Sequence, residues 1–326
     1  MTYDFLSKKI GSALLPTPVK KLERISEESG FNITIKRDDL TKFLSGGNKI
    51  RKLEYLFYDA KKKNASTVVT CGGIQSNHCR ATAVMAREFG FKPVLFLRGE
   101  DTSDPEGNLL IDKLLDCEIH WITSEQYKQR EAIMDEYKQS SDIPESVYLI
   151  PEGGSNAVGA LGYMNQFVEL SEQIDLDSCN AVFSAAGSGG TMAGLIMGKI
   201  LTGKKVKIVG INVTKDASSE FVERIYDIIR SSAEMYNLDI NVSKNDIHIY
   251  DDFVGEAYAV PTEDGIKNIV NLVRKEGILL DPVYTSKAFT GMLEISRSEK
   301  YENSIFIHTG GAFANFAYSN FYREYF

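Results

Sequence analysis

Five short segments combine glycine with side chains that can bind or react with a small molecule. The first is Gly187-Ser188-Gly189-Gly190-Thr191, which follows an apolar run and opens a helical pattern. Closely spaced glycines let backbone N–H groups point inward, and a helix N-terminus adds positive potential, so the segment is typical of a phosphate cradle. A tight strand-to-helix turn that needs positive φ angles is the simpler alternative.

The same loop does not fit the common nucleotide-binding patterns. Met192 stands where a dinucleotide-binding G-x-G-x-x-G segment needs its third glycine, and no acidic residue for a ribose follows near Asn212-Val213-Thr214. The Walker pattern G-x-x-x-x-G-K-[ST] is absent from the chain. The loop therefore predicts a site for a single phosphate monoester.

The second segment, Ser45-Gly46-Gly47-Asn48-Lys49-Ile50-Arg51-Lys52, places a lysine at the start of a helical pattern. A cation in the first turn of a helix is poorly placed for the helix dipole. The charged form of Lys49 is then disfavoured, as a lysine that forms a Schiff base requires. Taken alone, this segment fits a solvated basic helix start (Lys49, Arg51, Lys52) better than a reactive lysine.

Three further segments contain polar groups beside glycine or proline. Gln75, Ser76, Asn77 and His78 follow Gly72-Gly73 as four consecutive hydrogen-bonding side chains, which is more than a helix cap needs. The other two are Asp281-Pro282-Val283-Tyr284-Thr285 and His308-Thr309-Gly310-Gly311, near the C-terminus. Taken alone, each segment is typical of a turn, and Tyr284 is typical of a core residue.

The elements that must position these segments alternate between short apolar runs and helical patterns. One series covers roughly 65–150 and a second covers roughly 180–310, and the glycine-rich segments fall where strands end and helices begin. Such alternation predicts parallel sheets with helices on both faces. We expect an α/β protein of two doubly wound open-sheet lobes, with the ligand in the crevice between them.

Composition limits the classes of partner and compartment. The 326-residue chain has a net charge of −8, which argues against nucleic acid and anionic membranes as main partners. It has no signal-peptide core and no apolar stretch of membrane-spanning length, so we expect a cytoplasmic protein.

The four cysteines form no CxxC pair and suit no metal site. Cys71 and Cys79 flank the Gln75–His78 segment, where buried packing is favoured over a redox role.

Taken together, the segments resemble the fold-type-II, or tryptophan-synthase-β-like, pyridoxal-phosphate (PLP) enzymes that include D-cysteine desulfhydrase and 1-aminocyclopropane-1-carboxylate (ACC) deaminase. The resemblance covers nearly the whole chain, in order: Thr17-Pro18, KRDDLT (36–41), GGNKIRKLEYL, GGIQSNH, PEGGSNAVGALGY (151–163), GSGGTMAGL, LDPVYTSKAFTGM and FIHTGG (306–311). It implies pyridoxal 5'-phosphate as cofactor, a small amino acid as substrate and a homodimer. It also implies a small domain at 46–163 and a large cofactor-binding domain formed by 1–45 plus 164–326.

The resemblance assigns roles to individual residues. Lys49 matches the Schiff-base lysine, and Asn77 matches the residue that binds the ring hydroxyl of the cofactor. Ser76 matches a serine close to the substrate, and Tyr258 and Tyr284 match two active-site tyrosines. The remaining assignments are the phosphate loop Gly187, Ser188, Gly189, Gly190 and Thr191, a supporting charge from Lys52, and substrate contacts from Gln75 and Asn77 in addition to Ser76 and Tyr284.

Two positions bear on the choice of substrate. ACC deaminases have a DPVYE motif, with a carboxylate after the tyrosine, and they have leucine before the C-terminal glycine pair. At these two positions this chain has Thr285 and Thr309, as the desulfhydrase branch does. A carboxylate would keep the pyridine nitrogen of the cofactor protonated, but a threonine hydroxyl cannot balance a full charge. We therefore expect β-elimination, with D-cysteine giving pyruvate, sulfide and ammonia. The stretch 312–316 departs from the desulfhydrases, which have a proline there, and leaves the shape of the substrate end open.

Several alternatives stay open from the sequence. ACC deaminase would release 2-oxobutyrate and ammonia, and a lyase for another β-substituted alanine, such as cysteate, would expel a different group. A catalytically silent PLP-binding protein is an alternative of another class, although it would need neither the lysine nor the tyrosines. Lys49 is the leading candidate for the general base, with Ser76 or a tyrosine as alternatives.

Overall fold

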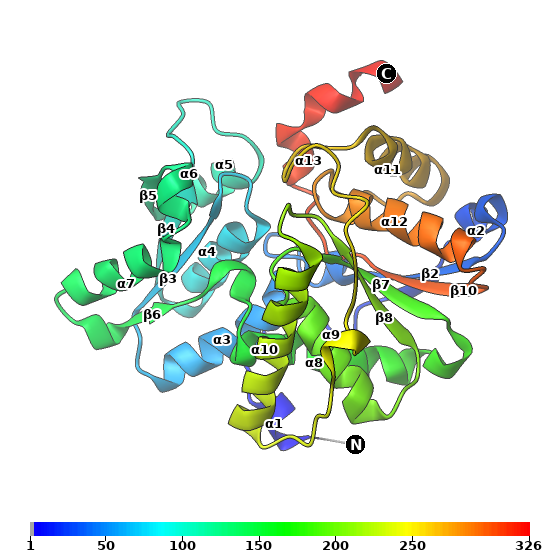
Figure 1. Ribbon diagram of the computed structural model, residues 1–326. Helices are drawn as coiled ribbons and strands as arrows, with labels where there is room; N and C mark the ends of the chain where they lie inside the picture. The colour runs from blue at the N-terminus through cyan, green and yellow to red at the C-terminus, as the bar shows by residue number, and fades with distance from the viewer. Residues whose placement is uncertain (1–2) are drawn as a thin grey trace.

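The computed structural model describes residues 3–326, which form two lobes, each built on its own sheet (Figure 1). The larger lobe contains a six-stranded sheet, with β1 antiparallel to β2 and every other neighbouring pair parallel. Its strands, in spatial order, are β1 (Val19–Lys21), β2 (Asn32–Lys36), β10 (Asn303–Ile307), β7 (Ala181–Ala186), β8 (Lys207–Asn212) and β9 (His248–Tyr250).

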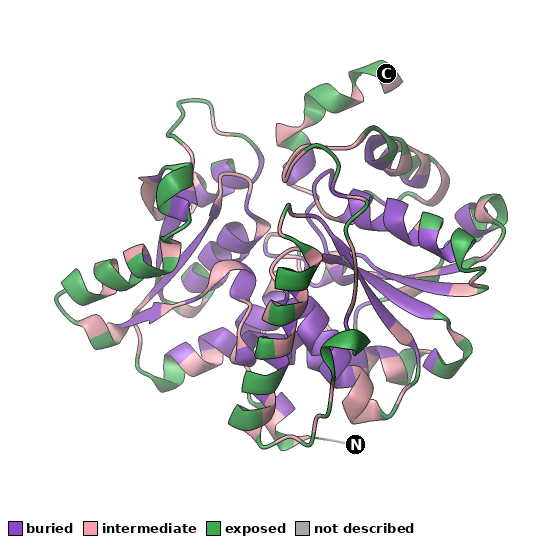
Figure 2. Ribbon diagram, viewed as in Figure 1, coloured by how far each residue is buried: buried purple, intermediate pink, exposed green. Residues whose placement is uncertain are grey.

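Helices cover both faces of this sheet, because its central strands are apolar along their whole length. All six residues of β7 are buried, as expected for a parallel strand packed on both sides (Figure 2). One face packs against α8 (Ala157–Gln173), α9 (Gly190–Thr202) and α10 (Ser218–Tyr236). The opposite face packs against α2 (Glu23–Ser29), α11 (Glu263–Glu276) and α12 (Thr285–Ser298).

The smaller lobe has a four-stranded, fully parallel sheet. Its strands, in spatial order, are β5 (Glu118–Ile122), β4 (Lys92–Arg98), β3 (Thr67–Gly73) and β6 (Val147–Leu149). Apolar side chains of α3 (Asn48–Lys62), α4 (Asn77–Phe89) and α5 (Gly107–Leu114) pack against the sheet. Another cluster joins the sheet to α6 (Ser124–Tyr127) and α7 (Arg130–Ser140).

The expected fold class is confirmed, and the larger lobe also contains strands outside the two series that the sequence indicated. β1 and β2 were not anticipated, yet β2 pairs with β10, more than 260 positions later in the chain. The domain boundaries expected at 46 and 163 stay predictions; within this region, α8 packs into the core of the larger lobe from its first turn.

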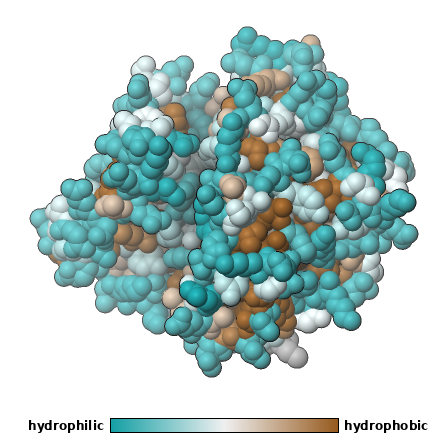
Figure 3. All heavy atoms as spheres, viewed as in Figure 1, coloured by the Kyte–Doolittle hydropathy of each residue, from teal (hydrophilic) through white to brown (hydrophobic). Residues whose placement is uncertain are grey.

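Two further α-helices are short: α1 (Asp4–Ser7) and α13 (Ala314–Ala317). Polar side chains cover most of the face shown in Figure 3, and a hollow separates the lobes at the top of that view. Within residues 3–326, no helix combines the length and the apolar character needed to cross a bilayer.

Candidate active site

A cavity lies between the lobes, where the loops after several parallel strands meet. From the smaller lobe it is lined by the end of β3 and the start of α4; from the larger lobe it is lined by the loops after β7, β8 and β10 and by the start of α12. In doubly wound proteins, ligands bind at this edge of the sheet. The expected location of the ligand between the lobes therefore coincides with a cavity that both lobes line.

Most of the predicted site residues line this cavity. These are Lys49, Ser76, Asn77, Gly187, Ser188, Gly189, Thr191, Tyr258, Tyr284 and Thr309. Four others lie outside its lining: Lys52, Gln75, Gly190 and Thr285.

Lys49 lies in the first turn of α3, where its amine faces the cavity. Burial lowers the pKa of Lys49 to about 8, although Asp281 and Glu152 favour the charged form. Its Nζ donates a hydrogen bond to Asn48 Oδ1 at 3.1 Å. A lysine with this pKa has a substantial neutral fraction at physiological pH, as a nucleophilic amine requires.

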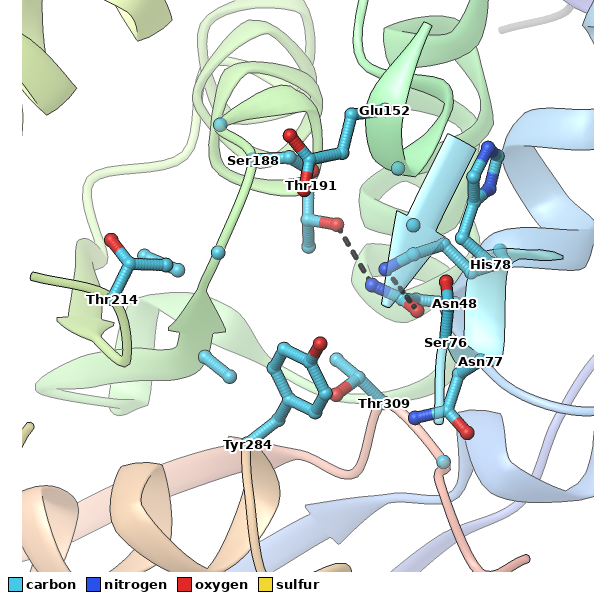
Figure 4. Close-up of a pocket in the computed structure, with 18 of the residues that line it drawn as sticks. Asn48, Ser76, Asn77, His78, Glu152, Ser188, Thr191, Thr214, Tyr284 and Thr309 are labelled. Carbon is cyan, nitrogen blue, oxygen red and sulfur yellow. Dashed lines mark hydrogen bonds between the residues drawn. The ribbon is translucent and has the colours of Figure 1, made fainter. Parts of the chain in front are cut away.

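Asn48 connects Lys49 to two other walls of the cavity, although the sequence analysis gave it no role. Its Nδ2 donates to Thr191 Oγ1 at 3.1 Å, a contact drawn in Figure 4, and its backbone N–H donates to the Thr309 carbonyl at 2.9 Å. Because a charged lysine only donates, Asn48 Oδ1 is directed toward Lys49 and Nδ2 toward Thr191.

The loop after β7 turns into α9 with the geometry expected of a phosphate cradle. Gly189 precedes the helix with φ of +90°, a conformation that favours glycine. The first N–H groups of a helix lack partners within the helix, and here they lie beside the hydroxyls of Ser188 and Thr191 at the cavity. These N–H groups and hydroxyls are suited to bind a phosphate monoester, such as the phosphate group of PLP.

Lys52 reaches this loop through one intervening hydroxyl. Its Nζ donates to Ser155 Oγ and to the Gly153 carbonyl, both at 3.2 Å. Ser155 Oγ lies 2.8 Å from Ser188 Oγ and accepts a hydrogen bond from the Gly190 N–H at 3.1 Å. Burial lowers the pKa of Lys52 well below its ordinary value, and the nearby Lys49 charge lowers it further. The Lys52 side chain is therefore in position to support the phosphate loop through Ser155.

The segment after β3 supplies polar groups to the opposite wall. Ser76 caps α4, with Oγ accepting from the Cys79 N–H at 3.1 Å, and its hydroxyl hydrogen stays free to donate. Asn77 opens α4 and lines the cavity. Gln75 turns away, and its Nε2 donates to the Glu106 carbonyl at 3.0 Å. The substrate contact expected for Gln75 stays a prediction, and the observed bonds of its amide support the neighbouring loop.

His78 also borders the cavity as a buried, neutral side chain. Its Nε2 lies 2.9 Å from Thr70 Oγ1, and its buried Nδ1 has no hydrogen-bond partner within the described residues. Burial lowers the pKa of His78 well below its ordinary value, and the charges of Lys49 and Lys52 lower it further. The histidine therefore adds no positive charge to the site near neutral pH.

Tyr258 and Tyr284 form a hydrogen-bonded pair through their hydroxyls. Burial raises the pKa of Tyr258 to about 12 and raises the pKa of Tyr284 well above its ordinary value. Both hydroxyls thus stay protonated near neutral pH and can donate hydrogen bonds, but neither is suited to act as a base. Arg98, from the smaller lobe, lies over the Tyr258 ring at 5.7 Å from its centroid.

Asp281 is a cavity residue that the sequence analysis quoted without assigning a role. Its Oδ1 accepts from the N–H groups of Val283 and Tyr284, at 2.9 and 2.7 Å. Its Oδ2 accepts from the N–H and hydroxyl of Thr285, at 2.9 and 2.6 Å. Thr285 is therefore held by Asp281, and the cofactor contact expected for Thr285 stays a prediction.

Thr309 faces the cavity from the end of β10 (Figure 4). His308 joins the backbone after Thr309 to the segment before α12: Nδ1 accepts from the Gly310 N–H at 3.2 Å, so Nε2 carries the hydrogen and donates to the Leu279 carbonyl at 2.9 Å. Of the two threonines expected near the cofactor, Thr309 is the one with direct access to the cavity.

Glu152, another cavity residue without an assigned role, is partnered outside the cavity. It accepts a hydrogen bond from the Tyr127 hydroxyl at 2.8 Å and pairs with Arg130 at 3.1 Å. In the described part of the chain, both carboxylates that line the cavity, Asp281 and Glu152, therefore already have donors.

Cys71 and Cys79 are buried behind the Gln75–His78 segment. Burial raises the pKa of Cys71 to about 12 and the pKa of Cys79 well above its ordinary value. Both side chains are therefore neutral thiols near physiological pH, the form that reacts slowly with oxidants.

The two-lobed α/β fold has one cavity that is lined by both a lysine of lowered pKa and a phosphate cradle. This combination defines a class of enzyme that holds a phosphorylated carbonyl cofactor. The comparison with known families agrees, because residues 10–310 match the family described as pyridoxal-phosphate dependent enzyme. The chain belongs to this family, and its cofactor is pyridoxal 5'-phosphate.

Individual relatives indicate which members of this family the chain is similar to. The chain is 49% identical to a Thermotoga maritima protein provisionally named ACC deaminase, over 95% of this chain and 98% of the relative. It is 36% identical to a Klebsiella pneumoniae D-cysteine desulfhydrase, over 93% of this chain and 94% of the relative. A solved structure described as an ACC deaminase homologue superposes with a TM-score of 0.88 at 35% identity, covering 97% of this chain and 96% of that one. The chain is thus a PLP-dependent enzyme of the group that contains both activities.

Proposed function

We propose that the chain catalyses β-elimination from a small amino acid and that its substrate is D-cysteine. The reaction consumes one water and gives pyruvate, hydrogen sulfide and ammonia. The observation that carries the proposal is the polar character of the cavity: Thr309 offers a hydroxyl, and both lining carboxylates already accept hydrogen bonds from the protein.

This polar character favours a reaction that needs only moderate electron withdrawal. When bound, PLP draws electrons from the substrate's α-carbon, and a charged partner at its ring nitrogen would strengthen that effect. A hydroxyl such as that of Thr309 donates a hydrogen bond but cannot balance a positive charge. Loss of an α-proton followed by departure of a good leaving group such as thiolate needs less stabilisation than opening a cyclopropane ring that has no α-hydrogen.

The side chains of the cavity can divide the remaining work. Lys49 binds the cofactor, and its pKa of about 8 suits an amine that takes and returns a proton at the α-carbon. The Ser76 hydroxyl can donate to the substrate carboxylate. Tyr258 and Tyr284 stay protonated, so they can donate to the departing sulfur. These roles assign the base to Lys49 among the three kinds of candidate that the sequence left open.

ACC deamination is the second candidate, supported by the name of the T. maritima relative. A panel assay separates the two: purified holoenzyme is given D-cysteine, L-cysteine, ACC and D- and L-cysteate, and sulfide, sulfite, pyruvate and 2-oxobutyrate are measured. We expect sulfide and pyruvate in equal amounts from D-cysteine, at a kcat/KM at least tenfold above every other substrate. 2-Oxobutyrate from ACC at a higher kcat/KM would replace the proposal with ACC deaminase, and turnover of none would favour a PLP-binding protein without catalysis.

A further inference from the structure

The amide of Asn77 has a defined orientation in the cavity wall. Its Oδ1 accepts a hydrogen bond from Asn108 Nδ2 at 3.0 Å. Figure 4 shows the consequence: the amide nitrogen of Asn77 faces the cavity and the oxygen is directed away from it. Asn77 therefore presents an N–H donor, and not an acceptor, to any group that binds there.

The orientation of Asn108 is in turn set by a donor that cannot reverse its role. Arg80 NH1 donates to Asn108 Oδ1 at 2.8 Å, and a guanidinium has no acceptor. The Nδ2 of Asn108 must then face the opposite way, where the Gln75 carbonyl at 2.9 Å and Asn77 Oδ1 accept from it. Reversing the Asn108 amide would place its N–H groups against a cation in a site that water does not reach, since Arg80 is 1% and Asn108 0% exposed.

Both residues are held by elements on more than one side. Arg80 NH2 donates to the carbonyl of Gly46, in the loop before α3, at 3.2 Å, and the guanidinium lies 4.7 Å from the centre of the Phe313 ring. The backbone N–H of Asn108 donates to Gln75 Oε1 at 2.8 Å. The chain of contacts from Arg80 through Asn108 to Asn77 thus joins α4 and α5 to the segment that carries Lys49.

We propose that Arg80 and Asn108 are positioning residues that hold Asn77 as an obligatory donor to the ring hydroxyl of the cofactor, and that they thereby set the pH at which the bound cofactor loses its proton. The inference rests on the contact between Asn77 and that hydroxyl, which the family resemblance implies. It does not depend on which amino acid is the substrate. A donor stabilises the ionised form of an oxygen, so it lowers the pH at which the proton is lost.

The test replaces Asn108 by Asp, which keeps the shape and the bond from Arg80 but removes the donor to Asn77. The Asn77 amide must then reverse, with Nδ2 toward the new carboxylate and Oδ1 toward the cavity. The matched control is Thr82→Val, also on α4, because the buried Thr82 hydroxyl has no hydrogen-bond partner within residues 3–326. Asn77→Ala provides the reference for complete loss of the donor.

The readout is the visible absorption of the bound cofactor, titrated with pH in the holoenzyme without substrate. Loss of a hydrogen bond to a charged group should raise the midpoint in Asn108→Asp and Asn77→Ala by about one to two pH units. Thr82→Val should titrate as the wild type does. Equilibrium dialysis gives a second readout, in which the dissociation constant for PLP should rise about tenfold in both variants and stay unchanged in the control.

A double variant distinguishes positioning from general damage. If Asn108 acts through Asn77, then Asn77→Ala/Asn108→Asp should shift the midpoint no further than Asn77→Ala alone. An unchanged midpoint and PLP affinity in Asn108→Asp, or fully additive shifts in the double variant, would overturn the inference. If D-cysteine is not turned over while these shifts appear, the proposed substrate fails and the positioning role stands.

Discussion

At the scale of single residues, Lys49 shows how the environment of a side chain selects its chemistry. Asp281 and Glu152 favour its charged form, but burial of the amine outweighs them and brings its pKa to about 8. The tyrosine pair is shifted in the opposite sense, because burial disfavours the phenolate. One cavity thus places an amine that readily loses its proton next to phenols that keep theirs.

The pKa of Lys49 predicts how cofactor binding depends on pH. Only the neutral amine can attack the carbonyl of PLP, so the rate of holoenzyme formation from apoenzyme should rise with pH and level off above a midpoint near 8. Stopped-flow absorbance at fixed, excess PLP measures this rate. A midpoint near the ordinary lysine value of about 10.4 would contradict the prediction. Lys49→Ala, the control, should show neither the absorbance change nor turnover.

At the scale of elements, a buried ionic network fixes α3 against the larger lobe. Arg51, two residues after Lys49, pairs with Asp38 at 2.8 Å and with Glu169 on α8 at 2.9 Å. Lys36 on β2 also pairs with Glu169, and the Tyr163 hydroxyl donates to Asp38 at 2.7 Å. The position of Lys49 relative to the phosphate loop therefore depends on contacts among β2, α3 and α8.

This network predicts an acid-dependent loss of stability. Burial alone would raise the pKa of Glu169, but Arg51 and Lys36 outweigh it and lower the pKa to about 2. A carboxylate of lowered pKa stabilises the folded state above its unfolded pKa of about 4.3, and this contribution disappears as pH falls toward 2. The free energy of unfolding, from urea titrations, should fall more steeply over this range in the wild type than in Glu169→Gln. Equal slopes would contradict the prediction.

A second tether at this scale holds the loop that carries Tyr258. Lys287, on α12 and buried, donates from Nζ to the carbonyls of Val254 and Ala257, at 2.7 and 3.1 Å. The Tyr318 hydroxyl donates to the Ala259 carbonyl at 2.9 Å on the other side of Tyr258. The loop has little regular structure of its own, so these bonds position its tyrosine.

Lys287→Met should therefore weaken catalysis through Tyr258. We expect kcat/KM to fall about tenfold or more, because one or two hydrogen bonds from a charged donor are lost. Combination with Tyr258→Phe should add little further loss, as expected for side chains that act through one group. Ser286→Ala is the control, since the buried Ser286 hydroxyl, adjacent on α12, has no hydrogen-bond partner in the part of the chain that the structure describes. A fully additive double variant would indicate a separate role for Lys287.

At the scale of the whole molecule, apolar side chains on the surface bear on assembly. Phe43 is 86% and Phe316 64% exposed, and the Phe313 ring, one helical turn before Phe316, lies 5.8 Å from that of Phe43. Exposed aromatic side chains are typical of protein–protein interfaces.

We propose that the chain forms a homodimer through the surface that carries Phe43, Phe313 and Phe316. Sedimentation equilibrium should give twice the mass of one chain, and Phe43→Ser/Phe316→Ser should shift the equilibrium toward the monomer. Phe326→Ser is the control, because Phe326 is 96% exposed and lies at the C-terminus. A monomeric wild type would refute the homodimer, and a double variant that stays dimeric would place the interface elsewhere.

Local sequence patterns were sufficient to predict the fold class and the groups whose chemistry is local. Alternating apolar and helical patterns were sufficient for two α/β lobes, and glycine beside hydroxyls at a strand end was sufficient for the Ser188–Thr191 cradle, because such features arise within a few consecutive residues. Lys49 required more, since its neighbours alone suggested a solvated helix start, and its role followed from a resemblance along the whole chain.

Which side chains contact one another in the cavity depends on the packing of separate elements. Thr285 bonds to Asp281 while Thr309 reaches the cavity, although the two seemed equivalent in the sequence. The orientation of Asn77 depends on Asn108, 31 positions away, and the placement of Tyr258 depends on Lys287, 29 positions away. Hydrogen-bond partners brought together by the packing of separate elements leave no local pattern, because neither partner restricts the residues beside the other.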